Sequence, residues 1–481
     1  MDDNGWKKRA KSTSMVGGED RISKLTDSVI LHILSFLPTD QVVKTCILSK
    51  RWKLIWYAVP TLFFSNDIAS ELEWKQSRQK FYSYVDKYLK HRKKAMYYIV
   101  DSVITSFDLD MYDFYQRSKA GILDKWLAFA IENKVKELHL RIGLERKNNR
   151  FYPEYYCLPK VVENGTYLTV LELKCLELDS SHSFSFPFLK ALSLEEIQQS
   201  DKAKDDVVFK FLLGCRCLEK LRLHKYEFLR SGDKIPLQSL SLKFLELTYT
   251  TNLDGLQVEA INLESLVITC RFPSNIDFSA CKKIRNLSFD GTVLVFDAIK
   301  PPSLNALISY YPLLENLTLT FRPKQYEKHL RISSQQLKSF SFKNCHFEPC
   351  NITIESVPKL SYFCYEGYID LTISIESSNS LSGKIVICKE DYDAAWYIDM
   401  LNFLLNLNCS WNTISLHVEE CEALIWPEKF TRVCRSPLLN WKHLKVITKC
   451  NNPEIISDLK DSLIWISPSL ETLSINKMQI F

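Results

Sequence analysis

The sequence predicts an α/β protein with three short N-terminal helices, followed by a solenoid of stacked repeats that forms a curved parallel β-sheet. Two observations lead to this prediction. Residues 20–62 carry aliphatic and indole side chains at helical spacing, interrupted by prolines. From residue 135 onward, a short pattern of alternating leucines recurs through most of the chain. The length of 481 residues allows two or more domains or one long repeat array.

Each N-terminal helix has its own start and stop signals. Thr26 or Asp27 is a candidate N-cap for the first helix, which apolar residues at helical spacing continue until Pro38. Thr39 restarts the chain into a second helix, and Ser49 is a candidate N-cap for a third. A segment of about 40 residues lies near the lower limit for independent folding, so a partner is expected to cover part of its apolar surface.

Residues 25–56 resemble the F-box of plants, most closely in the strings SFLPT (35–39) and LSKRW (48–52). The resemblance implies docking on an SKP1-like adaptor and through it on a cullin-RING ubiquitin ligase. It also implies which residues face the adaptor: Leu25, Ile33, Leu37, Pro38, Leu48, Arg51, Trp52 and Trp56. Thr26 departs from the proline that the family usually has at the head of the first helix.

The charge balance argues against a nucleic-acid binder but is uneven along the chain. There are 62 Lys and Arg against 57 Asp and Glu, a net charge of only +5. Between residues 41 and 66, however, the chain has Lys44, Lys50, Arg51 and Lys53 and no acidic residue. This run suits an acidic partner, which the adaptor of the F-box family is.

The second strong feature is the pattern L-x-x-L-x-L. It recurs at residues 135–140, 168–173, 189–194, 218–223, 242–247, 263–268, 284–289, 314–319, 337–342 and 360–365, and in degenerate form at 411–416, 441–446 and 470–475. A poorly marked repeat is expected near 384–388. The spacing is close to the leucine-rich-repeat length of about 20–29 residues. Alternate leucines lie on one side of a short strand, and one repeat cannot cover its own, so the repeats are expected to stack.

These patterns divide the chain into five segments: a disordered basic tail (1–19), the F-box (20–62), a helical linker and solenoid cap (63–133), leucine-rich repeats (134–383), and degenerate repeats that resemble the closing FBD domain of plant F-box/leucine-rich-repeat proteins (384–481). The linker has helical stripes through Tyr84 and Tyr88 and through Trp126 and Ala130. The C-terminal segment is expected to contain a helix over 453–466.

The expected location is the nucleus, the cytoplasm or both. The N-terminal residues are polar, without a secretory signal, and no run of 18 apolar residues could span a membrane. The basic cluster at residues 7–11 is a candidate nuclear-import signal. The 15 cysteines include no C-x-x-C pair and mostly fall in apolar runs, which favours reduced thiols.

No catalytic, cofactor-binding or metal-binding pattern stands out. The nine histidines lack H-E-x-x-H spacing, and the chain has no G-x-S-x-G or phosphate-binding glycine motif. A binding surface remains, formed by the residues that flank each strand leucine. In the early repeats these are charged, and Lys220, Arg222 and His224 suit an acidic target; in the middle repeats they are small and neutral.

The sequence therefore predicts a non-catalytic substrate-recognition subunit of an SKP1–cullin–F-box ubiquitin ligase, whose repeats bind a target protein. Two alternatives stay open at this point. Proteins of similar layout in plants sense small hormones at the surface of the solenoid. The Thr26 departure also allows an interaction scaffold whose F-box no longer engages a ligase.

Overall fold

The computed structural model divides the chain into two compact units, Met1–Asp110 (unit 1) and Met111–Phe481 (unit 2). It describes residues 22, 24–65, 74–96, 103–111, 115–143, 155–179, 181–199, 206–229, 235–270, 276–291, 308, 310–321, 329–344, 351–369, 371–376, 380–388, 394–407, 409, 411–449, 452–476 and 478–479. The basic tail at residues 1–19 lies outside these ranges.

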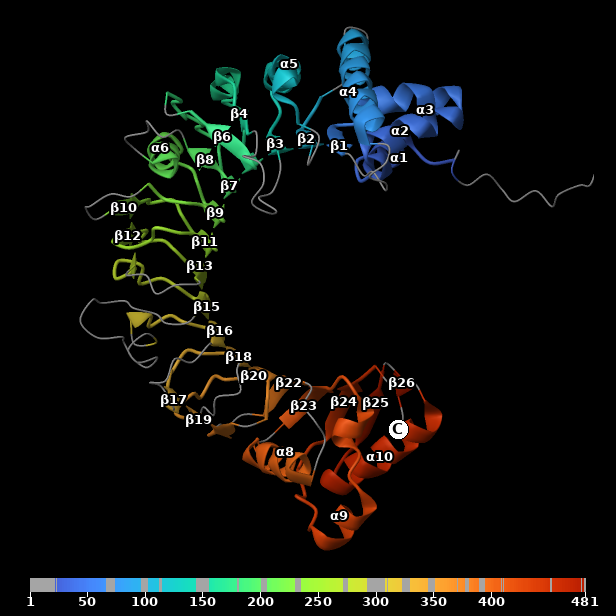
Figure 1. Cartoon of the computed structure of the whole chain (residues 1–481), viewed down its shortest axis with the longest axis vertical. Helices are drawn as coiled ribbons and strands as arrows, with labels where there is room; N and C mark the ends of the chain where they lie inside the picture. The colour runs from blue at the N-terminus through green and yellow to red at the C-terminus, as the bar shows by residue number, and fades with distance from the viewer. Residues whose placement is uncertain are drawn as a thin grey trace, which may run out of the picture. The chain divides into compact units, whose positions relative to one another are not determined.

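Unit 1 begins with the three predicted helices (Figure 1). They are α1 (Asp27–Leu34), α2 (Thr39–Lys44) and α3 (Lys50–Ile55), with the 3-10 turns η1 (Thr45–Ile47) after α2 and η2 (Trp56–Ala58) after α3. Ser49 caps α3 as predicted, because its hydroxyl accepts a hydrogen bond from the Trp52 backbone N–H at 3.3 Å. Thr26 is the N-cap residue of α1, but its hydroxyl lies 3.0 Å from that of Ser28 and bonds no helix N–H.

The long helix α4 (Trp74–Met96) completes the core of unit 1. Its Tyr88 ring lies 5.0 Å from Trp56 and 5.4 Å from Phe64, which belongs to β1 (Thr61–Ser65). Strand β1 pairs in parallel with β2 (Ser106–Met111). Part of the apolar surface of the F-box, which the sequence assigned to a partner, is therefore covered by later residues of the same unit.

A buried arginine ties α4 to the F-box. Arg92 is fully buried and donates hydrogen bonds to the carbonyl oxygens of Trp56 at 3.0 Å and Val59 at 2.9 Å. These carbonyls belong to buried residues at the start and just after the end of the turn η2, where buried backbone acceptors need donors. The guanidinium also bonds the Tyr88 side chain, and burial lowers the pKa of Arg92.

In unit 2 a parallel sheet runs in sequence order from β3 to β25 along an arc (Figure 1). Its parallel strands are β3 (Glu137–Ile142), β5 (Val170–Lys174), β7 (Ala191–Glu195), β9 (Lys220–His224), β11 (Phe244–Thr248), β13 (Ser265–Cys270), β15 (Asn286–Gly291), β16 (Asn316–Phe321), β18 (Ser339–Asn344), β20 (Tyr362–Gly367), β22 (Leu381–Ile387), β23 (Trp411–His417), β24 (His443–Ile447) and β25 (Thr472–Ile475). A last strand, β26 (Met478–Gln479), pairs antiparallel with β25. This confirms the predicted curved parallel sheet.

The repeat leucines are held in register. Leu138 pairs with Leu171, Leu171 with Leu192 and Leu192 with Leu221, and each is almost fully buried. The poorly marked repeat near 384–388 is also present, as β22. Its Gly383 is required by packing, because a Cβ there would lie 2.4 Å from the Trp411 ring.

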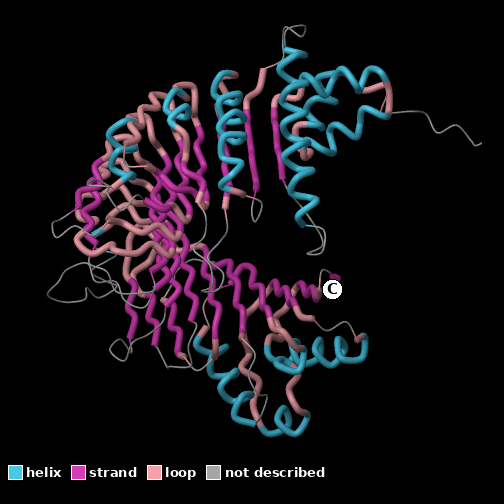
Figure 2. Tube along the Cα trace, turned by 45° about the horizontal axis from the view of Figure 1, so that its top comes forward, coloured by secondary structure: helices cyan, strands magenta, loops and turns pink. Residues whose placement is uncertain are grey.

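Short sheets and helices lie on the outer side of the arc, so the long sheet lines the inner, concave side (Figure 2). The short parallel sheets are β4 (Tyr156–Cys157), β6 (Leu176–Leu178) and β8 (Gln198–Gln199); β10 (Ile235–Gln238), β12 (Leu256–Glu259) and β14 (Ile276–Asp277); and β17 (His329–Ile332), β19 (Asn351–Ile354) and β21 (Thr372–Ile375). The helical segments are η3 (Arg117–Lys119), α5 (Ala120–Glu132), η4 (Lys160–Asn164), α6 (Val207–Gly214), α8 (Ala394–Asn406), η5 (Cys421–Leu424), α9 (Glu428–Val433) and α10 (Pro453–Ile466).

The two linker helices belong to different units. Helix α4 lies in unit 1, whereas α5 lies in unit 2 and buries Leu123, Trp126 and Leu127. Helix α10 has the predicted bounds, with the Asn452 side chain accepting from the Glu454 N–H at 3.1 Å. Among the described residues, no helix is both long and apolar enough to cross a membrane.

Left-handed residues end several strands of the long sheet. Cys175, Glu196, Lys225 and Tyr249 have φ between 47° and 54°, and Gly143 has φ 125°. At this turn the N–H of Cys175 donates to the Glu195 carbonyl, that of Glu196 to His224, and that of Lys225 to Thr248. The strained turn recurs because it allows one more backbone hydrogen bond from the end of each strand to the next strand before the chain leaves the sheet.

We expect Gly143→Ala to destabilise unit 2 by about 1–3 kcal/mol, because an alanine is strained at this φ. The new Cβ would also lie 2.8 Å from the Cys175 carbonyl oxygen. Gly121→Ala in α5 is the matched control: its Cβ would meet nothing within 4 Å, and it should leave stability unchanged or raise it by up to about 1 kcal/mol. Urea unfolding followed by tryptophan fluorescence measures both. Equal midpoints for the two variants would contradict the assigned turn.

Arg92→Met should destabilise unit 1 by about 2 kcal/mol or more, because two buried carbonyl oxygens lose their donors. Lys90→Met on the same helix is the control, since it removes only an exposed 2.6 Å pair with Asp86, worth about 0–1 kcal/mol. Amide hydrogen exchange in α3 and α4 reports the difference. Equal protection of these amides against exchange in the two variants would refute the role of Arg92.

Candidate functional site

The predicted adaptor-facing residues separate into exposed and buried groups. Leu48 is 60% exposed and Ile33 is 43% exposed, while Leu37 and Pro38 are half-buried. These four side chains are available for contact with a partner. They come from the end of α1, the turn before α2, and the segment between η1 and α3.

Trp52 and Trp56 are buried in the chain by itself, and their contact with an adaptor stays a prediction. Their exposures are only 6% and 8%, so both are core residues in this structure. Trp56 packs against Tyr88 of α4, a helix that the F-box pattern does not include. The physical reason is that indole rings with a covering helix nearby gain more from burial than from exposure to water.

Arg51 and Leu25 serve internal contacts. The Arg51 Nε donates to the Asp27 carboxylate at 2.7 Å, and Nη2 donates to the Leu25 carbonyl oxygen at 2.6 Å. The guanidinium therefore joins α3 to the start of α1. Arg51 is half-buried, so it positions the helices and still has an accessible edge.

Sequence reasoning missed the most exposed apolar side chains of the F-box. Ile47 is 84% exposed, Phe36 is 73% exposed and Leu54 is 65% exposed. A soluble protein gains nothing by exposing such large side chains together in a small domain, unless a partner covers them. We define the exposed apolar set of the F-box as Ile33, Phe36, Ile47, Leu48 and Leu54. The signal was present in α3, since Leu54 lies two residues after the buried Trp52 and so falls on the opposite side of the helix.

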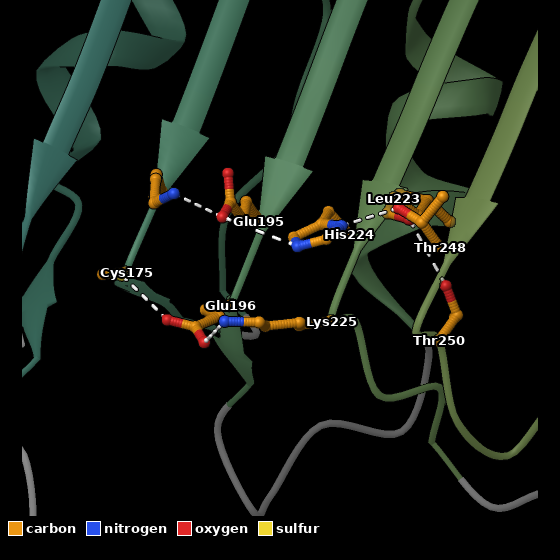
Figure 3. A network of polar contacts seen from close by, with 9 residues as sticks. Cys175, Glu195, Glu196, Leu223, His224, Lys225, Thr248 and Thr250 are labelled. Atoms are coloured by element: carbon orange, nitrogen blue, oxygen red, sulfur yellow. Dashed lines mark hydrogen bonds and ion pairs between the residues drawn. The ribbon is translucent and has the colours of Figure 1, made fainter. Parts of the chain in front are cut away.

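The concave face of unit 2 has a polar network at the C-terminal ends of β5, β7, β9 and β11 (Figure 3). Glu195 pairs with Lys174 and lies 3.9 Å from His224 Nε2. His224 Nδ1 lies 2.7 Å from the Thr248 hydroxyl, which along with Thr250 donates to the Leu223 carbonyl oxygen. Neighbouring repeats are thus connected through their side chains as well as through their backbones.

The predicted target-binding residues lie together on β9, at the expected face. Lys220 and Arg222 are exposed, and His224 is half-buried. Arg222 forms an ion pair with Glu246 at 3.1 Å. Both Lys220 and Arg222 also lie over the Phe244 ring, at 5.4 and 5.5 Å. The charge of Arg222 is therefore neutralised within the sheet, and an acidic target would compete with Glu246 for it.

A second layer of contacts lies just beyond the strands. Cys175 Sγ lies 3.1 Å from the Glu196 carboxylate, which also accepts from Lys225 Nζ at 2.9 Å (Figure 3). Burial and the bond to Glu196 raise the pKa of the Cys175 thiol to about 12. A thiol in this state is a hydrogen-bond donor and has no nucleophilic character at neutral pH.

The middle of the concave face has little charge. Ser265 pairs in register with Asn286, Asn286 with Asn316, and Asn316 with Ser339. The Asn316 amide donates to the Asn286 side-chain oxygen at 2.7 Å, so the two amides pair across adjacent strands. These groups offer donors and acceptors to a bound peptide but no acid–base chemistry. Among the described residues, no group of three or more His, Cys, Asp and Glu side chains could hold a metal ion.

Two protein-family models match the chain. The model described as the F-box domain matches residues 22–63. The model described as "At1g61320/AtMIF1, LRR domain" matches residues 101–328. Both matches end before residue 384, so the expected FBD-like character of residues 384–481 stays a prediction.

Similar proteins come from Arabidopsis thaliana. F-box/LRR-repeat protein 25 is 31% identical over 50% of this chain and 76% of its own length. A putative F-box/LRR-repeat protein is 29% identical over 53% of this chain and 45% of its own length. An F-box/FBD/LRR-repeat protein is 30% identical over 50% of this chain and 48% of its own length. The chain thus spans less than half the length of the last two relatives.

We expect buried cysteines to resist alkylation in the folded protein. Burial raises the pKa of Cys175 to about 12 and those of Cys215 and Cys281 to about 11, so almost no thiolate exists at pH 8. Cys217 is exposed and is the internal control. Iodoacetamide labelling followed by peptide mass spectrometry should modify Cys217 first and the three buried thiols only after unfolding. Labelling of Cys215 as fast as Cys217 would contradict this arrangement.

Proposed function

Because this chain belongs to the F-box/LRR-repeat protein family, we propose that it is the target-recognition subunit of an SKP1–cullin–F-box ubiquitin ligase. In this assembly the F-box binds an SKP1-like adaptor, and the repeats bind the protein to be modified. One observation carries the first part: the F-box leaves the large side chains of the exposed apolar set in water, although its tryptophans are buried.

The chemistry of the exposed apolar set fits an adaptor helix or groove. Burying large apolar side chains on association contributes about 25 cal/mol per Å². Neighbouring residues in the sequence are basic: Lys50 and Lys53 are exposed, Lys44 pairs with Asp40 at 2.9 Å, and the segment 41–65 has no acid. An acidic partner with an apolar surface would satisfy both features. Arg51 and the Ser49 cap hold α3 in place before the partner arrives, which lowers the entropy cost of binding.

The repeats supply the second half of the proposal. A long concave sheet offers side chains from successive strands at about 4.8 Å spacing, which suits an extended segment of another protein. The proposed role needs no catalytic residue in this chain, because the ligase performs the transfer and this subunit brings the target close to it. We place this activity in the nucleus, the cytoplasm or both.

The adaptor interface is tested by Ile47→Asp/Leu48→Asp. The double variant should weaken adaptor binding by at least about 2 kcal/mol, or more than tenfold, because two exposed apolar contacts become charged. Isothermal titration with a recombinant SKP1-like adaptor measures the affinity. The variant should fold normally, since Ile47 and Leu48 are 84% and 60% exposed.

Leu213→Asp is the matched control, because Leu213 on α6 is 81% exposed and lies in unit 2. It should bind the adaptor like the wild type. Trp52→Ala is expected to act differently from the surface variants, losing thermal stability together with binding, since Trp52 is a core residue. Adaptor binding that survives the Ile47/Leu48 change would reject the proposed interface.

A further inference from the structure

The cations of the concave face are unequally neutralised. In the first half of the sheet, Lys174 pairs with Glu195, and Arg222 pairs with Glu246. Farther along, Lys343 on β18 pairs with Glu366 on β20. Lys384 on β22 and Lys445 on β24 have no ion-pair partner among the described residues of the chain.

These two lysines flank a hydroxyl in the register of the sheet. Lys384 pairs with Ser415 of β23, and Ser415 pairs with Lys445. Strands lie about 4.8 Å apart, so the two lysine side chains start about 10 Å apart and can converge above Ser415. Each of the three residues lies between buried neighbours on its strand, which places all three on the concave side.

An imidazole completes the cluster. His417 follows Ser415 on the same face of β23, and its Nε2 lies 2.9 Å from the Ser415 hydroxyl. Its cross-strand neighbours, Val386 and Ile447, are apolar. Burial and the two nearby lysines lower the pKa of His417, as expected where positive charge is uncompensated. The acid of the adjacent strand β20, Glu366, is held by Lys343.

From this geometry we infer that Lys384, Ser415, His417 and Lys445 form a binding site for one phosphoryl group, carried by a phosphorylated serine or threonine of a target protein. The two ammonium groups match the charge of a phosphomonoester dianion, and Ser415 provides a neutral donor between them. A bound dianion would also favour a proton on His417, which adds a third charged donor.

The arrangement favours a phosphoryl group over a stretch of carboxylates. A site for an acidic segment lying across the strands would need further cations on the neighbouring strands. The register neighbours of the cluster are instead uncharged: Cys364 precedes Lys384, and Ser474 follows Lys445. A single carboxylate would leave one lysine uncompensated. The positive charge is concentrated in three adjacent strands, which suits one compact group with two negative charges.

This inference rests on the proposed function only in taking the phosphoryl carrier to be a target protein. It is tested with the full chain and no adaptor, so a failed phosphoryl site and a failed adaptor interface give different results. The probes are three mixtures of short fluorescein-labelled peptides with randomised neutral flanks. Their central residue is phosphoserine, serine or glutamate, and fluorescence anisotropy measures binding.

The wild type should bind the phosphoserine mixture at least about tenfold more tightly than the serine mixture. Lys384→Gln/Lys445→Gln should abolish this preference, and Lys384→Arg/Lys445→Arg should keep it. The matched control is Lys174→Gln/Lys343→Gln, which removes the same charge from the same face at lysines that already have glutamate partners. It should keep the preference.

Three results would overturn the inference. The first is an equal loss in the two glutamine variants, which would reduce the effect to general electrostatics. The second is equal binding of the glutamate and phosphoserine mixtures, which would indicate an acidic segment instead. The third is phosphoserine-peptide binding that a large excess of inorganic phosphate leaves unchanged, because a site for the phosphoryl group would also accept the free anion.

Discussion

The structure depends on one constraint: a short strand buries only every second side chain, and no single repeat can cover the leucines that it buries. Leu171 is covered because Leu138 and Leu192 lie beside it in register, and the same holds strand after strand. A buried leucine contributes about 1.5–3 kcal/mol, so a shift of one residue would expose the whole apolar set. The left-handed turns at Gly143, Cys175 and Glu196 follow from this constraint, because they end each strand at the same point.

The same alternation leaves the other half of each strand without a role in the core. Charged side chains on this half form ion pairs between neighbouring repeats. Arg222 pairs with Glu246 on the next strand, and Lys174 pairs with Glu195. Such pairs stabilise the stacking locally and reduce the attraction of the surface for other molecules. Where the pairing stops, at Lys384 and Lys445, the surface keeps the potential that a charged ligand needs. Charge balance between adjacent repeats thus distinguishes a structural part of the concave face from a part suited to binding.

The repeats could be predicted from sequence because the signal is local: two leucines around one residue define a strand and its buried side. The bounds of α10 followed for the same reason, from a proline start and a helical stripe. The burial of Trp56 could not be predicted this way, because its cover, Tyr88, lies beyond the F-box pattern and a helical stripe does not say what packs on it. The pair of Arg222 with Glu246 was within reach, since aligning the leucine patterns places these residues opposite each other. Residue types alone do not show this pair, because it depends on the register of two strands.

Burial of the two tryptophans changes how the F-box surface is understood. If they were exposed, the domain would lose its small core, because about 40 residues bury little apolar area by themselves. Trp56 instead packs against Tyr88, and Arg92 donates hydrogen bonds to the carbonyl oxygens of Trp56 and Val59. Helix α4 therefore stabilises the F-box. Ile47 and Phe36 can then remain in water without endangering the fold. The exposed Lys50 and Lys53, which follow Ile47 closely in the sequence, oppose self-association of that apolar surface, because two copies would bring like charges together. The combination suits the acidic adaptor that we propose as the partner.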